Sequence, residues 1–177
     1  MEEMSAEVMG IENKEEQIEK IMNWHGQEIL QLVYSYVNNK ALAEELTQDI
    51  FVKCYKAMHT YNGKSKLKTW LWRIAINHCK DFLKSWYNKN VFNTEEESLY
   101  NRTSKEIVEQ TVIQKEEESQ LIVALMNLPI KYREVIYLFY YEELRIKEIA
   151  IVTEVGVNTV KTRLRRAKEL LKERLEE

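Results

Sequence analysis

The sequence contains few of the residues that hairpin turns, disulfides and membrane spans require. Four glycines and one proline among 177 residues leave little turn chemistry for β-hairpins, and no stretch shows the alternation typical of a half-buried strand. The two cysteines, Cys54 and Cys79, are too few for a disulfide framework, which favours a reducing cytoplasm. The acidic N-terminus lacks the apolar run of a secretory signal, and no run approaches the roughly 20 apolar residues of a membrane span. The predicted fold class is all-α.

Sequence signals for catalysis are missing as well. The chain has no glycine-rich phosphate loop, no His–carboxylate metal motif, and no Ser or Cys nucleophile in a recognisable turn. His78 and Cys79 are adjacent, but His25 and His59 do not supply further metal ligands at helical spacing. We therefore expect no catalytic residue, no metal, no cofactor and no small-molecule substrate, and the chain is not predicted to be an enzyme.

The net charge of −3 conceals two basic islands between acidic segments. Residues 1–19 contain seven acidic residues and one basic residue, and residues 92–120 contain eight acidic and three basic. By contrast, residues 53–89 contain nine basic residues and one acidic residue, and residues 161–174 contain seven basic and two acidic. This asymmetry predicts a polyanionic partner that is contacted at two separate places.

Changes in apolar periodicity predict two small helical domains joined by a linker. Three amphipathic helices are expected in the first domain, and the second domain is expected to end in two helices joined by a short turn. Between the domains, apolar periodicity is lost and Asn, Glu, Ser and Thr become frequent. The predicted boundaries are a flexible acidic lead at 1–15, a first domain at 16–88, a linker at 89–115 and a second domain at 116–177.

The last helix of the second domain is predicted to have one apolar side and one DNA-binding side. Apolar residues recur at steps of three and four, at Val157, Val160, Leu164, Ala167 and Leu171. A neighbouring face is polar throughout, with Asn158, Lys161, Thr162 and Arg165. A shorter apolar helix and a turn precede it, which together match the helix-turn-helix plan for the DNA major groove. The alternative is a solvated C-terminal helix whose cations suit the helix dipole.

A second basic helix, at about residues 67–87, combines cations with tryptophan. Trp70 and Trp72 are two positions apart, about 200° around a helix, so at least one indole is expected near the surface. Cations and an amide lie before and after them, at Lys66, Lys68, Arg73, Asn77 and Lys80. Aromatic rings interleaved with cations suit unstacked nucleic-acid bases. The alternative is that these tryptophans belong to the core.

An acidic helix face is predicted at Glu44, Glu45, Gln48 and Asp49. These residues lie one, three and four positions apart, so their side chains can share one side of a helix. A surface that meets a protein partner is the favoured interpretation, and a metal site is the alternative.

Three of these stretches, in this order, resemble a known family. Residues 43–51, 69–77, and 148–150 with 159–167 are similar to segments of sigma-70-type initiation factors of the extracytoplasmic-function (ECF) group. The resemblance implies that residues 43–51 dock on RNA polymerase, that residues 69–77 open and read the −10 promoter element, and that the last stretch reads the −35 element in duplex form. It also implies an alternative initiation factor whose partners are bacterial core RNA polymerase, promoter DNA and an anti-sigma factor.

The resemblance extends two of the candidate sites. For polymerase binding it adds Phe51 to the acidic face, and for the −35 element it adds Thr159, Arg163 and Arg166. The sequence departs from the family pattern at Arg145, which stands where a Ser-like helix cap is usual, and at Glu154, which stands where glycine is usual in the turn. Gly156 is expected to serve as a substitute cap there.

Two other functions remain as alternatives. A free-standing helix-turn-helix regulator predicts tight, specific duplex binding without polymerase and a two-fold symmetric site. A helical nuclease that uses Glu44, Glu45 and Asp49 predicts metal-dependent cleavage.

Overall fold

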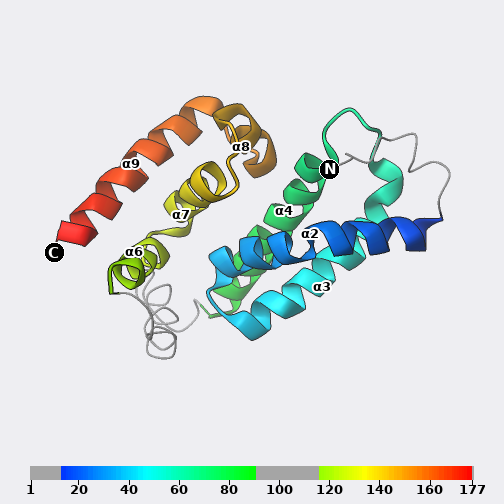
Figure 1. The fold of residues 1–177 in the computed structure, drawn as a ribbon, viewed down its shortest axis with the longest axis horizontal. Coiled ribbons are helices and arrows are strands. Elements are labelled where there is room, and N and C mark those ends of the chain that lie inside the picture. The colour runs from blue at the N-terminus through cyan, green and yellow to red at the C-terminus, as the bar shows by residue number, and fades with distance from the viewer. Residues whose placement is uncertain (1–12, 91–115, 177) are drawn as a thin grey trace.

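The computed structural model describes residues 13–90 and 116–176, and within these residues the chain forms helices and no strands. The first group of helices comprises α2 (Lys14–Val37), α3 (Lys40–Ala57), a 3₁₀ turn (Met58–Thr60) and α4 (Leu67–Asn90). The second group comprises α6 (Glu116–Met126), α7 (Ile130–Ile136), a π-helical stretch (Tyr137–Tyr141), α8 (Ile146–Thr153) and α9 (Val157–Glu176). Figure 1 shows the two groups side by side. The all-α prediction with two helical regions is confirmed.

The predicted segment boundaries shift slightly at the helices. Helix α2 already begins at Lys14, within the predicted acidic lead, and α4 continues to Asn90, within the predicted linker. The rest of the predicted lead and linker, residues 1–12 and 91–115, lies outside the described residues.

Two adjacent asparagines separate α2 from α3. Asn38 adopts a left-handed conformation with φ 49°, and its N–H donates to the Tyr34 carbonyl, which ends α2. Asn39 then caps α3, because its side-chain oxygen accepts from the Leu42 N–H at 2.9 Å. Because the connection is so short, α2 and α3 form an antiparallel pair and pack along each other.

Helix α4 packs on α2 and α3, and one of its faces is fully buried in the core. Its core residues are Leu71, Trp72, Ala75, Ile76 and Cys79, each 0% exposed. Burial raises the pKa of the Cys79 thiol to about 12, and the same cause has the same effect on Cys54. Both cysteines are free thiols in the core, and buried thiols of this kind are chemically inert. With this face inside, the opposite side of α4 carries the polar residues of the predicted base-reading helix.

The second group contains the predicted helix-turn-helix. Val160, Leu164 and Ala167 of α9 are buried, as the apolar periodicity predicts, whereas Val157 at the first turn is exposed. Helix α9 packs against α7 and α8. The apolar stripe therefore fixes the rotation of α9 and directs its neighbouring polar face outward.

Both unusual positions of the helix-turn-helix are accommodated locally. Arg145 has no acceptor in its side chain, and instead its N–H donates to the Glu148 carboxylate at 2.8 Å, which is half of a capping box. Glu154 itself adopts the left-handed conformation (φ 57°), and its N–H donates to the Ala150 carbonyl. The expectation that Gly156 serves as the substitute cap is therefore wrong, because Glu154 is the left-handed residue that ends α8.

Candidate nucleic-acid and protein interfaces

The polar face of α9 is open to solvent over its first three turns. The residues that are exposed are Asn158, Thr159, Lys161, Thr162, Arg165 and Arg166. Arg163 is half-buried and lies 3.8 Å from the Glu134 carboxylate. The Thr162 hydroxyl donates to the Asn158 carbonyl at 3.0 Å, and Arg166 pairs with Glu169 at 3.1 Å. The structure thus brings together all of the predicted −35 residues except Arg163 on one accessible surface.

The polar face of α4 is occupied by the second group of helices. The Arg73 guanidinium contacts the Glu154 carboxylate, with Nη2–Oε1 and Nε–Oε1 distances of 2.7 and 2.8 Å. Asn77 also hydrogen bonds to Glu154, and these bonds, with that of Arg73 the larger, lower the pKa of the Glu154 carboxyl. Lys80 Nζ lies 3.0 Å from both Glu134 Oε1 and the Thr153 carbonyl oxygen.

The two tryptophans at the start of α4 have different environments. Trp72 is 0% exposed, its ring meets His25 edge-on at a centroid distance of 5.6 Å, and Lys68 Nζ lies 4.6 Å from its centroid. The prediction that Trp72 contacts DNA is corrected, because a ring enclosed by α2 and Lys68 cannot stack on a base. Trp70 is half-buried, as the 200° separation allows. Its ring lies 5.6 Å from that of Tyr61, an aromatic residue that sequence reasoning missed.

Lys68 and Lys66 also differ in their surroundings. Lys66 is exposed, whereas Lys68 bridges Glu28 at 3.0 Å and Glu142 at 3.1 Å. Burial alone would lower the pKa of Lys68, but the hydrogen bonds to these two carboxylates outweigh it and raise the pKa. Lys68 therefore connects α2 and α4 to the residue that follows the π-helical stretch, Glu142.

The acidic face of α3 is present at the surface. Glu44, Glu45, Gln48 and Asp49 are exposed, while Phe51 is 5% exposed and packs in the core. Phe51 therefore does not belong to the candidate contact surface, and its side chain instead packs α3 against the core. A histidine of α4 lies beside this face, with His78 Nε2 3.9 Å from Asp49. Burial lowers the pKa of His78, so it is neutral at pH 7 and leaves the surface acidic.

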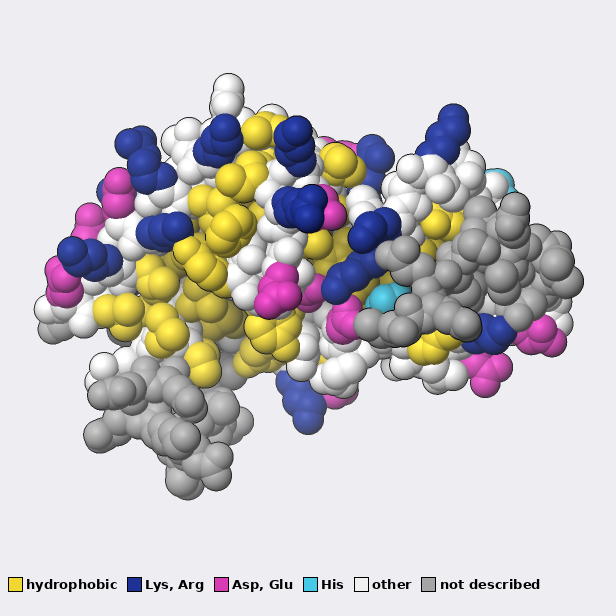
Figure 2. All heavy atoms as spheres, turned by 45° about the horizontal axis from the view of Figure 1, so that its top comes forward, with side chains coloured by type: hydrophobic (Ala, Val, Ile, Leu, Met, Phe, Trp, Pro, Cys, Tyr) yellow, Lys and Arg dark blue, Asp and Glu magenta, His cyan; other side chains and the backbone are white. Residues whose placement is uncertain are grey.

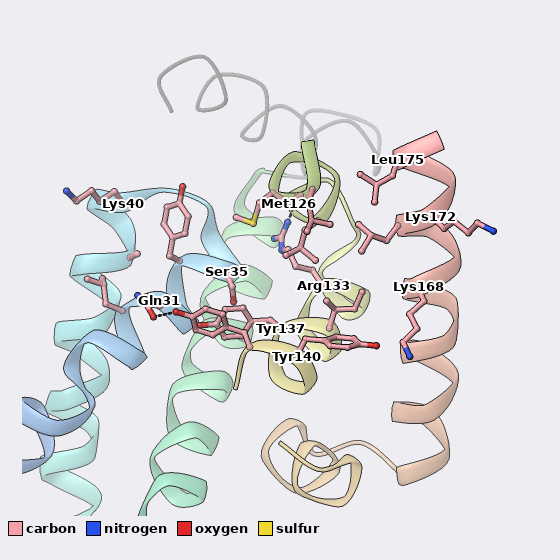
Figure 3. Close-up of a pocket in the computed structure, with 18 of the residues that line it drawn as sticks. Gln31, Ser35, Lys40, Met126, Arg133, Tyr137, Tyr140, Lys168, Lys172 and Leu175 are labelled. Atoms are coloured by element: carbon pink, nitrogen blue, oxygen red, sulfur yellow. Dashed lines mark hydrogen bonds between the residues drawn. The ribbon is translucent and has the colours of Figure 1, made fainter. Parts of the chain in front are cut away.

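An apolar groove between the two groups of helices was not predicted from the sequence. It has a volume of about 1340 Å³, and its walls are formed by α2, the start of α3, α6, α7, the π-helical stretch and α9. Figure 3 shows Tyr137 and Tyr140 in its middle, with Lys168, Lys172 and Leu175 of α9 along one side. Figure 2 shows hydrophobic side chains gathered between Lys and Arg on the side of the molecule that α6 to α9 form. Local periodicity cannot reveal such a groove, because it forms where helices distant in sequence fail to meet.

Comparison with protein families assigns both groups of helices. The family described as Sigma-70 region 2 matches residues 21–87, and Sigma-70, region 4 matches residues 118–171. The chain belongs to the sigma-70 family. Relatives place it in the ECF group: ECF RNA polymerase sigma factor SigW of Bacillus subtilis is 32% identical over 88% of this chain and 87% of its own length. RNA polymerase sigma factor SigV of the same organism is 30% identical over 84% of each chain.

Solved structures show the same fold at low sequence identity. The sigma factor RpoE, in a complex with the anti-sigma factor NepR from Bartonella quintana, superposes with a TM-score of 0.70 at 19% identity, over 90% of this chain and 97% of that one. CnrH, in a complex with the cytosolic domain of CnrY, gives a TM-score of 0.64 at 20% identity, over 92% and 89% of the two chains.

The family assignment decides between the functions left open by the sequence. The chain is an alternative sigma factor, a transcription initiation factor, and the free-standing regulator is not favoured because a region 2 domain accompanies the helix-turn-helix. Members of this family are initiation factors rather than catalysts. Among residues 13–90 and 116–176, no helix is long and apolar enough to cross a membrane.

Proposed function

We propose that this sigma factor directs bacterial core RNA polymerase to its promoters through three separate surfaces. The acidic face of α3 binds the polymerase, the polar face of α4 reads the melted −10 element, and α9 reads the −35 element as a duplex. The observation that carries this proposal is the presence of regions 2 and 4 in one chain and in this order.

The exposed face of α9 has the chemistry that the major groove requires. Lys161, Thr162 and Arg165 lie nearest the base edges, where Lys or Arg recognises guanine and a bidentate pair contributes about 1–3 kcal/mol of discrimination. Arg166 and Arg163 flank them and contact phosphates, which positions the helix without reading sequence. Asn158 and Thr159, in the first turn of α9, face the same groove.

The polar face of α4 has the chemistry to bind unpaired, unstacked bases. Asn77 can hydrogen bond to a base edge, and Arg73 and Lys80 lie one turn to either side of it. Trp70 and Tyr61 supply aromatic surface at the start of the helix, and stacking there offsets the cost of unpairing by roughly 1–3 kcal/mol per base. Lys66 adds an exposed cation beside them.

The groove between the two groups of helices is the surface that we propose for an anti-sigma partner. Its walls are apolar and its rim carries Lys40, Lys168 and Lys172. An amphipathic helix with acidic flanks fits this chemistry, because the apolar side is buried and the acids meet the lysines. Two structures with this fold are complexes with an anti-sigma factor or, for CnrH, with the cytosolic domain of CnrY.

Run-off transcription tests the proposal. A library of candidate promoters is transcribed with bacterial core polymerase and this protein, each alone and together, beside gel shifts at the same salt. Promoter-selective transcripts are expected only when both proteins are present. Tight specific duplex binding without any effect on the polymerase would instead favour the free-standing regulator.

Variants assign the three surfaces. Glu45→Lys with Asp49→Lys is expected to weaken polymerase binding, whereas Glu19→Lys, an exposed reversal on α2, is the control. Lys161→Ala with Arg165→Ala is expected to reduce transcription most at promoters that depend on the −35 element. Unchanged polymerase affinity in the α3 double variant contradicts the docking assignment.

A further inference from the structure

Val157, the first residue of α9, lies outside the core although it continues the apolar stripe of that helix. Val160, Leu164 and Ala167 of the stripe are buried, whereas Val157 is 36% exposed. Among the described residues it belongs neither to the core nor to the partly buried apolar side chains that pack against the core. The helical period predicts an inward position for Val157, and the start of the helix instead leaves it at the surface.

The surface that surrounds Val157 is the one that we assign to the −35 element. Over the first three turns of α9, every other exposed side chain is polar. Val157 lies one turn before Lys161, so the two side chains share one side of the helix, and Asn158 follows it directly. A single exposed valine elsewhere on a protein needs no explanation. Because this valine lies at the edge of a DNA-reading face, a duplex that binds that face also meets Val157.

The turn before α9 leaves the approach to Val157 open. Gly156 is exposed, and within the described residues a Cβ added to it would meet only the Thr159 hydroxyl oxygen, at 3.8 Å. Glu154, and not Gly156, is the left-handed residue of this turn. The fold therefore does not require glycine here for its conformation. A position without a side chain beside Val157 suits the close approach of a ligand to the start of the helix.

The major groove presents an apolar group that the polar residues of α9 do not recognise. This group is the C5-methyl of thymine, whereas the other base-edge groups are hydrogen-bond donors and acceptors. Lys161 and Arg165 have the chemistry for guanine, and Asn158 has the chemistry for adenine. The side chain of Val157 has neither a donor nor an acceptor, so a methyl group is the base-edge feature that it complements. Burial of one methyl-sized group corresponds to a gain in affinity of about fourfold.

We infer that Val157 selects a thymine in the −35 element: its side chain packs on the C5-methyl of that base, beside the base pair that Lys161 contacts. This inference rests on the proposed assignment of α9 to the −35 duplex. Cytosine and deoxyuridine lack the methyl group, so both lose this contact. The contact neutralises no phosphate and is therefore independent of salt, unlike the contacts of the cations on the same helix.

Deoxyuridine tests the inference, because it differs from thymidine only by the C5-methyl group. The probe is a pool of double-stranded DNA with a randomised central segment, prepared once with thymidine and once with deoxyuridine. The full-length protein, bound to core polymerase, selects from both pools, and sequencing gives the base preference at each position. The variants are Val157→Ala, Val157→Ile, and Ile151→Ala, an exposed β-branched residue of α8 that serves as the control.

The wild-type protein is expected to prefer thymine at one position of its site, and this preference is expected to fall about fourfold in the deoxyuridine pool. Val157→Ile and Ile151→Ala show the same fall, because the first keeps the apolar side chain and the second lies outside α9. In Val157→Ala the preference at that position is equal in the two pools. The slope of binding against salt is unchanged in Val157→Ala, which alters no charge.

Two results overturn the inference. One is a wild-type protein whose preferences are the same in both pools, and the other is a Val157→Ala protein that keeps the full difference between the pools. Lys161→Ala with Arg165→Ala separates this failure from failure of the proposed function. If that double variant loses the selected site while the pools remain equivalent for the wild type, α9 still reads the duplex and only the role of Val157 is refuted. A selected site that the double variant leaves unchanged refutes the −35 assignment, and with it the inference.

Discussion

The hydrogen bond between Tyr36 and Glu134 gives a prediction whose size follows from burial. Tyr36 is 3% exposed and the Glu134 side chain 2%, so both groups have left water and each depends on the other. A hydrogen bond to a charged group contributes about 1.5–3 kcal/mol when solvent screens it little. We expect Tyr36→Phe to lower the free energy of unfolding by about that amount, since Lys80 continues to pair with the carboxylate.

Replacement of the carboxylate is expected to cost more than loss of the hydroxyl. In Glu134→Leu the Tyr36 hydroxyl remains buried without an acceptor, and Lys80 loses its ion pair. Breaking a buried pair costs about 3–5 kcal/mol, and because Lys80 is one-third exposed we expect about 2–4 kcal/mol here. The Tyr36→Phe/Glu134→Leu double variant leaves no stranded polar group on this pair and is expected to be more stable than the sum of the single changes by about 1–2 kcal/mol.

Urea unfolding followed by circular dichroism measures these differences. Tyr34→Phe is the control, because Tyr34 is half-buried on the same helix and its hydroxyl has no hydrogen-bond partner among the described residues. A Tyr36→Phe protein as stable as Tyr34→Phe refutes the reasoning, and so does additivity of the double variant within about 0.5 kcal/mol.

Three further predictions follow from individual positions. Trp72→Ala is expected to destabilise the protein by about 3–5 kcal/mol in thermal unfolding, whereas Trp70→Ala keeps its fold and weakens transcription from promoters with a good −10 element. Glu154→Gly is expected to be about 1 kcal/mol more stable than Glu154→Gln, because both lack the Arg73 ion pair and only glycine removes the cost of the left-handed conformation. Burial, with Glu134 adding to it, raises the pKa of Tyr36 well above its ordinary value. The stability that the neutral phenol provides is therefore complete below about pH 10 and falls as the pH rises above it. The Tyr36→Phe protein is expected to lose this contribution to the pH dependence of unfolding.

Sequence alone determined the helices and the surfaces that one helix can present. The periodicity of Val160, Leu164 and Ala167 places the polar residues of α9 outside whatever packs on the stripe, and the structure exposes nearly all of them. The same local rule exposes the acidic residues of α3. It works because the side chains of one helix are related by a fixed rotation per residue.

Tertiary structure decided which neighbours fill the space around each helix. Spacing showed that Trp70 and Trp72 could not both be inside, but only the packing of α2 against α4 selected Trp72, and only the core around α3 enclosed Phe51. The pairs of Arg73 with Glu154 and of Lys80 with Glu134 join residues 81 and 54 positions apart. The groove likewise lies between α2 and helices that follow it much later in the chain, α6, α7 and α9. Such contacts have no signature in a local period, because they depend on how the two groups of helices meet.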